Sequence, residues 1–200
     1  ISKSGQVTFM ANEEGEGSDA QNTFMNTMNS LINNGETNVG VVSQSGAAMA
    51  GDYDDEILSI DDIRAFDNYT NTSDIPLNVM SAKGKLIHEL FEQYQKQVVF
   101  NGDTEGQKYK ESDEAAKSVE NQVNSSDEYT VLTRTLYVQY DDSRPNMPSS
   151  VLFNVQVKNN KSGAIKTTRV TYNRINLNSK AGVIPRVITD VKQSNILKRK

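Results

Sequence analysis

The spacing of apolar residues changes near residue 128 of the 200-residue chain, and this change constrains the fold more than any other feature of the sequence. Before it, three stretches place apolar residues three and four positions apart, which predicts amphipathic helices. After it, apolar and polar residues alternate, which predicts strands that each bury one face. The expected order is strand, helix, strands, two helices and then a run of strands, which predicts an α+β fold.

Two central helices are expected, at about 82–98 and 112–124. Ser81 and Ser112 are suitable N-caps for them, because a serine hydroxyl can accept a hydrogen bond from the first helical turn. The acidic residues after Ser112 also suit the positive end of a helix dipole. These helices are predicted to pack with an N-terminal strand and helix segment and with a C-terminal antiparallel β-meander.

The N-terminal segment contains one clear helical pattern, at residues 19–33. Ser18 precedes it as an N-cap, and Gly35 follows it and can take the left-handed conformation that ends a helix. Strands are expected at residues 5–10, 39–42 and 57–63, the last running into a short turn or helix, with loops over 43–51 and 67–80.

The C-terminal third has the pattern of a β-meander. A loop is expected over residues 141–149, because Pro145 and Pro148 cannot donate a backbone hydrogen bond. The run from Asn159 to Gly163 is typical of a hairpin turn. The strands are expected at residues 129–140, 151–157, 164–177 and 183–191.

The length suits one domain. We expect residues 1–128 to form an α+β core and residues 129–200 to be a β-rich segment of the same domain. The chain begins at Ile1, so we expect it to be a piece of a longer protein. No stretch approaches the roughly 20 apolar residues that span a bilayer, which predicts that no membrane span is present. The absence of cysteine excludes disulfides and thiolate metal sites, but it does not fix the compartment.

Charge is unevenly distributed along the chain. Residues 1–62 carry 11 acidic side chains and one basic, whereas residues 151–200 carry 11 basic and one acidic. A basic surface can bind nucleic acid or anionic lipid. Here the basic residues alternate with Thr, Val and Tyr, and no recognition motif accompanies them. We therefore interpret them as a solvated sheet face and predict no nucleic-acid partner.

The single histidine of the chain, His88, carries the main chemical signal. Glu92 follows it by four residues on a predicted helix, so both side chains point the same way. Imidazole nitrogen and carboxylate oxygen are both zinc ligands. Glu89 stands directly after the histidine, where HExxH hydrolases carry the general base that takes a proton from metal-bound water. The acidic run from Asp52 to Glu56 lacks the EF-hand spacing, and we interpret it as a loop rather than a calcium site.

A third protein ligand must come from another element, and the next helix offers three carboxylates: Asp113, Glu114 and Glu120. Asp113 and Glu120 are seven residues apart, so they share a face. Glu114 and Glu120 are the alternatives to Asp113.

His88-Glu89 on one helix, followed by Asp113 to Asn121 on the next, resembles the bacterial effector-type and Rhs-associated zinc metallopeptidase domains over roughly residues 80–124. The resemblance implies that His88 and Asp113 are metal ligands, that Glu89 is the base, and that Glu120 and Asn121 support the site or the fold. It also implies a peptide or protein substrate and a place in a longer secreted or cell-surface bacterial protein.

This chain departs from that pattern in two ways. Glu92 stands where the second histidine of HExxH would be, which makes the motif HExxE, and Asp113 is shorter than the usual Glu. Two carboxylates weaken the Lewis acidity of the ion and shift preference from zinc toward harder ions such as manganese. The alternative function is a non-enzymatic interaction domain. In that case the β-rich half is the contact surface and His88 is incidental. Glu92 is then a helix-surface residue paired with Lys85, Lys96 or a C-terminal lysine. The oligomeric state is not predicted.

Overall fold

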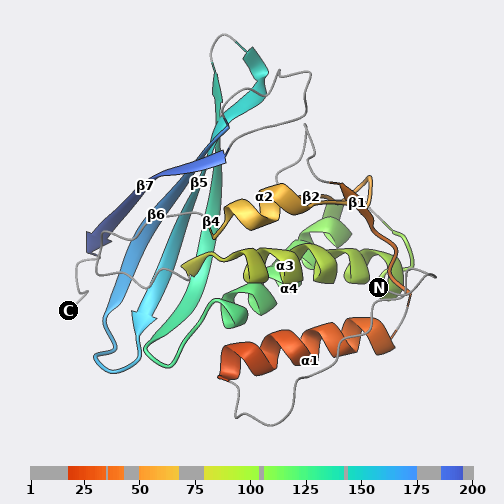
Figure 1. Ribbon diagram of the computed structural model, residues 1–200, viewed down its shortest axis with the longest axis horizontal. Helices are drawn as coiled ribbons and strands as arrows, with labels where there is room; N and C mark the ends of the chain where they lie inside the picture. The colour runs from red at the N-terminus through yellow and green to blue at the C-terminus, as the bar shows by residue number, and fades with distance from the viewer. Residues whose placement is uncertain are drawn as a thin grey trace.

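The computed structural model describes residues 18–34, 36–42, 50–67, 79–103, 106–141, 144–174 and 186–195, and within them the chain has the predicted α+β fold. The helices lie to one side of a twisted sheet formed by the C-terminal strands (Figure 1). The elements, in chain order, are α1 (Asp19–Asn33), β1 (Gly40–Val42), β2 (Gly51–Asp52), β3 (Ile57–Ser59), α2 (Ile60–Ala65), α3 (Ala82–Tyr94), the π-helix η2 (Gln95–Val99), α4 (Gly106–Val123), β4 (Tyr129–Asp141), β5 (Arg144–Asn159), β6 (Ile165–Arg174) and β7 (Arg186–Asn195).

Helix α1 has the predicted bounds, and its start is fixed by a capping box. The Ser18 side chain accepts from the Gln21 backbone, and the Gln21 side chain accepts from the Ser18 backbone. Its apolar face packs on α3 and α4 in a small core that buries Met28, Leu31, Ile87 and Val123. The predicted strand at residues 5–10 and the predicted stop at Gly35 lie outside the described residues.

Helices α3 and α4 pack closely, as predicted for the centre of the fold. Ser81 caps α3 by accepting a hydrogen bond from the Gly84 backbone, and its hydroxyl donates to Asn124 Oδ1 at 2.6 Å. A Cβ at Gly84 would lie 2.4 Å from the same Asn124 oxygen, so glycine allows the two helices to approach. The predicted helix over 82–98 continues past Tyr94, but its last turn is the π-helix η2.

Helix α4 begins at Gly106, so the prediction that Ser112 caps a helix of residues 112–124 is wrong. Ser112 lies inside the helix, is fully buried and donates to the Lys108 carbonyl at 2.9 Å. Asp113 consequently lies in the middle of α4, where the helix dipole has little effect.

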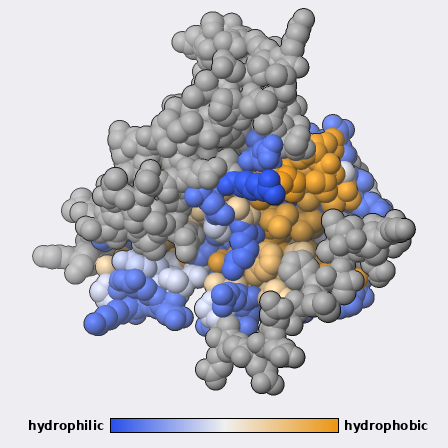
Figure 2. All heavy atoms as spheres, viewed as in Figure 1, coloured by the Kyte–Doolittle hydropathy of each residue, from blue (hydrophilic) through white to orange (hydrophobic). Residues whose placement is uncertain are grey.

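The small sheet has the order β1-β3-β2, with β1 parallel and β2 antiparallel to β3. The predicted strand at 57–63 becomes β3 followed at once by α2, as the sequence indicated. Apolar side chains gather over this sheet in Figure 2, and Val41 of β1 is 62% exposed.

The large sheet is an antiparallel meander in the order β4-β5-β6-β7, with the predicted hairpin turn between β5 and β6. Strand β5 begins at Arg144, so the predicted loop over 141–149 is wrong for residues 144–149. These residues pair with β4 alone, because in the described residues β6 first meets β5 at Ser150. The register also shifts near Tyr140. An unpaired side and a bulge are the settings in which a strand tolerates proline.

The main core lies where β3 and α2 meet the large sheet. Phe66 and Phe153 are fully buried with their rings edge to face, 6.3 Å apart, and Leu58, Val155 and Val170 pack in the same cluster. Each such side chain contributes about 1.5–3 kcal/mol through burial. The large sheet, β3 and α2 therefore share this core, and α1 packs in the smaller one. No helix among the described residues has the length and apolar character needed to cross a membrane.

Candidate metal centre

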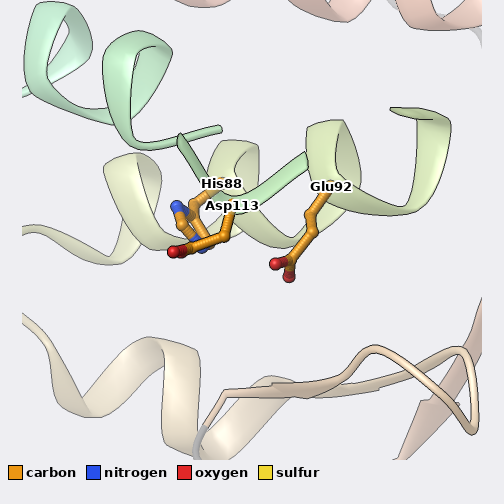
Figure 3. A group of neighbouring side chains, drawn as sticks. All are labelled: His88, Glu92 and Asp113. Carbon is orange, nitrogen blue, oxygen red and sulfur yellow. The ribbon is translucent and has the colours of Figure 1, made fainter. Parts of the chain in front are cut away.

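Helices α3 and α4 bring three predicted ligands together. His88 and Glu92 lie one turn apart on α3, Asp113 faces them from α4, and one ligand atom of each lies within 4.8 Å of the others. Figure 3 shows the three side chains projecting to the same side of the two helices. Tetrahedral zinc with ligands at about 2.0–2.2 Å places them roughly 3.4 Å apart. Small side-chain rotations would therefore close the site around one ion.

The Nδ1 side of the His88 ring contacts a buried network of charged side chains. Glu120 Oε2 lies 2.9 Å from His88 Nδ1, and it accepts hydrogen bonds from Arg134 Nε at 3.1 Å and Arg134 Nη2 at 2.7 Å. Two groups compete for Nδ1: the carboxylate of Glu120 can only accept, and Arg134 Nη2, 3.2 Å away, can only donate. We assign the ring proton to Nδ1 because Glu120 is the closer of the two, and the Nε2 lone pair then faces Asp113, 3.7 Å away. This is the arrangement in which a carboxylate orients a metal-binding histidine.

Both members of this pair are held in the charge state that metal binding needs. Burial, and then the charge of Lys85, lower the pKa of His88 below its ordinary value, which favours the neutral imidazole. Burial alone would raise the pKa of Glu120, but the charges of Arg134 and then Lys85, together with the hydrogen bond from His88, outweigh it. The pKa of Glu120 therefore lies below its ordinary value. A neutral imidazole backed by an anionic carboxylate is a good electron donor for a cation.

Glu92 is 5% exposed, so it is not the surface residue of the alternative interpretation. Burial, and then the negative charge of Glu89, raise the pKa of Glu92 to about 8. The two lysines considered as its partners are engaged elsewhere: Lys85 pairs with Glu89 at 2.9 Å and Lys96 with Glu56 at 3.2 Å. A buried carboxyl facing two other carboxylates is an unfavourable arrangement that a bound cation would relieve.

The raised pKa of Glu92 predicts a pH effect on stability. Its ordinary value is 4.5, so between pH 6.5 and 8 the unfolded chain has lost this proton while the folded, metal-free chain retains it. Stability should then fall as pH rises, by up to about 1.4 kcal/mol per pH unit, or about 2 kcal/mol across this window. His88 adds little here, because its lowered pKa lies below the window.

Glu92→Gln should remove most of this pH dependence and be more stable than the wild type at pH 8. Urea denaturation at pH 6.5 and 8.0 with a chelator present measures both free energies of unfolding. Glu111→Gln on α4, whose carboxylate is 43% exposed, is the control and should follow the wild type. The same pH dependence in Glu92→Gln and wild type would contradict the assignment.

Asp113 is the ligand that α4 presents, and the alternatives on that helix lie elsewhere. Glu114 points outward with a 64% exposed side chain and approaches Lys110 at 4.0 Å. Glu120 supports His88 instead of joining the ligand cluster. Asn121 donates to the Leu132 carbonyl at 3.4 Å, which places its side-chain amide against β4. Of the predicted supporting residues, Glu120 therefore touches a ligand, and Asn121 links α4 to the large sheet.

Glu89 lies beside the ligands and is 7% exposed. Its Oε1 pairs with Lys85 Nζ, and its Oε2 packs against β2, where a Cβ at Gly51 would come within 2.1 Å. Glycine at this position therefore leaves space for the carboxylate. The predicted base is held in a defined place, between a lysine of its own helix and the backbone of β2.

Sequence reasoning missed Arg134 and Tyr109, and it considered Lys85 only as a partner of Glu92. Lys85 is 5% exposed although lysine is rarely buried, and Arg134 comes from a different element, so the sequence carried no signal for their part in the site. Tyr109 precedes Asp113 by one turn of α4, a spacing that could have identified it. Burial, and then the charges of Glu92 and Asp113, raise the pKa of Tyr109 to about 12, so its phenol remains a hydrogen-bond donor near the site.

The acidic loop from Asp52 to Glu56 lies beside the candidate site and contacts the helices that carry it. Lys96 Nζ donates to the carbonyls of Tyr53 at 2.7 Å and Asp54 at 3.1 Å, which ties the loop to η2. The Tyr53 ring then meets Tyr109 edge to face at 4.9 Å. This agrees with the interpretation of the segment as a loop, and it anchors the loop to α3 and α4.

Comparison with known proteins gives no relative. The chain matches no family model, no curated protein and no solved structure.

Proposed function

We propose that this chain is a divalent-metal-dependent hydrolase domain of the metallopeptidase type, which cleaves peptide bonds by means of a metal-bound water. The observation that carries the proposal is the convergence of His88, Glu92 and Asp113, which are brought together from two helices and largely buried. The oriented Nε2 of His88 supports it further, because an accidental cluster of acids has no need of a buried carboxylate behind its histidine. Peptide as the substrate class rests on the resemblance to effector-type metallopeptidases.

The residues have separate parts in the proposed reaction. His88, Glu92 and Asp113 would hold the ion and leave one position for water, and the ion would polarise that water and the substrate carbonyl. Glu89 would accept the proton from the water and pass it to the leaving amine. Lys85 holds Glu89 in place through their 2.9 Å ion pair. Zinc is the proposed ion, and manganese is the alternative because two of the three ligands are carboxylates.

Metal titration of the purified protein tests the proposal. We expect one zinc or manganese ion per chain by calorimetry after removal of bound metal with a chelator. His88→Ala and Glu92→Gln should each weaken binding at least about 100-fold, because each removes one of three ligands. Glu92→Gln is the sharper variant, since it should fold at least as well as the wild type. Circular dichroism verifies the fold of both.

Two results would contradict the proposal. One is a wild-type protein that binds neither ion, which would favour the non-enzymatic interaction domain. The other is unchanged affinity in both variants, which would place the ion elsewhere. Hydrolysis of a quenched fluorescent casein then tests the substrate class separately from metal binding.

A further inference from the structure

Asp113 divides its two carboxylate oxygens between two neighbours. Oδ1 lies 3.7 Å from His88 Nε2, the nitrogen that faces the candidate metal position. Oδ2 forms an ion pair with Lys117 Nζ, which lies one turn further along α4. Lys117 therefore holds a candidate ligand through the oxygen that points away from His88 and leaves the other oxygen available.

The ion pair between Asp113 and Lys117 changes the net charge around the candidate ion. Two histidines and one carboxylate bring one negative charge to an ion, whereas His88, Glu92 and Asp113 bring two. Each added carboxylate makes the ion a weaker Lewis acid, because more of its charge is neutralised by its ligands. An ammonium paired with one of these carboxylates offsets one negative charge. The side chains of Lys117 and Asp113 are 32% and 21% exposed, so solvent screens this effect only in part.

We propose that Lys117, acting through Asp113, compensates for Glu92 in the HExxE motif: its paired charge returns the site to the net charge of a His-His-carboxylate site. The inference rests on the proposed function, since it concerns an ion held by these ligands. Lys85 also acts on the ligands through its charge, but it is paired with Glu89, so the two side chains together add no net charge to the site. Arg134 adds no net charge either, because its guanidinium pairs with Glu120 behind His88.

The test compares Lys117→Met with Lys110→Met, a matched control on the same helix. Lys110 approaches the exposed Glu114 at 4.0 Å, so its loss removes one positive charge from the protein without touching a ligand. Lys117→Met should bind zinc about tenfold more tightly than the wild type, which corresponds to about 1.4 kcal/mol, because an opposing positive charge is gone. Its kcat should fall about tenfold while KM changes little, because the ion polarises its water less. Lys117→Arg should restore both values.

The opposite signs of the two changes separate this inference from a simple structural role. A lysine that only orients Asp113 would lose metal affinity when replaced, typically by 10–100-fold, and that result would overturn the proposal. Unchanged affinity in Lys117→Met, or an equal gain in Lys110→Met, would overturn it as well. If the wild type bound no metal, both the inference about Lys117 and the proposed function would fail. If it bound metal without hydrolysing casein, the affinity measurements would still decide the part played by Lys117.

Discussion

Glu120→Gln should destabilise the metal-free protein by about 3–5 kcal/mol, the usual cost of leaving one partner of a buried ion pair alone. Glu120 is fully buried, and Arg134, which is 8% exposed, directs two nitrogens at its Oε2. A neutral amide would leave the guanidinium buried without a counter-charge. For a chain of this length the midpoint of thermal unfolding should fall by roughly 10 °C.

Urea denaturation with a chelator present measures this effect, and Glu111→Gln on the exposed face of α4 is the control, expected within about 0.5 kcal/mol of the wild type. The double variant Glu120→Gln with Arg134→Met should recover part of the loss, because it removes the unpaired charge. A single variant within about 1 kcal/mol of the wild type would show that the network does not stabilise the fold. Glu120→Gln should also weaken metal binding about 10–100-fold, since His88 loses the carboxylate that orients it.

Glu89→Gln should lower kcat for peptide hydrolysis by about 10²–10⁴-fold, the typical contribution of a general base. Glutamine has nearly the same shape, and its carbonyl oxygen can still accept from Lys85 beside β2, but the buried ammonium loses its counter-charge, so the variant should be less stable than the wild type and its fold is verified by circular dichroism. Metal content and affinity should therefore stay close to those of the wild type. Calorimetry for zinc and the initial rate of casein cleavage are measured on the same preparation.

Glu114→Gln is the control for this variant, because its outward-facing carboxylate lies on the same pair of helices without reaching the site. Its rate should equal that of the wild type. If Glu89→Gln bound metal and cleaved casein at an unchanged rate, another group would have to act as the base. In that case Glu89, the glutamate directly after His88 in the HExxE motif, would have no catalytic role.

The elements with a strong local signal could be predicted from the sequence. Helix α1 has the expected bounds because Ser18 and Gln21 form a capping box, which depends only on residues three apart. The start of α4 could not be predicted in this way. Residues 106–111 contain only one apolar side chain, Tyr109, and the helix there is supported by polar contacts such as Gln107 to Glu111 at 3.0 Å. The sequence predicts a shorter β5 because proline usually indicates a loop, whereas the start of β5 has a partner strand on one side only and tolerates proline there.

The candidate site also contains residues that the sequence predicts and residues that it does not. The four-residue spacing of His88 and Glu92 predicts a shared face, and the structure places both on one side of α3. The position of Asp113 beside these two residues depends on how α3 and α4 align. Periodicity does not specify that alignment, so the prediction of Asp113 rested on the family resemblance. Lys85 and Arg134 could not be predicted, because long-range packing determines whether a charged side chain is buried.

The contact of Arg134 with Glu120 has a consequence for dissecting the chain. Arg134 belongs to the first strand of the large sheet, yet its guanidinium completes the network behind His88. A fragment that ends at residue 128 would retain all three candidate ligands and lose the side chain that balances the buried carboxylate behind them. The smallest fragment that preserves the candidate metal centre must therefore include β4, together with the strands that keep β4 in register.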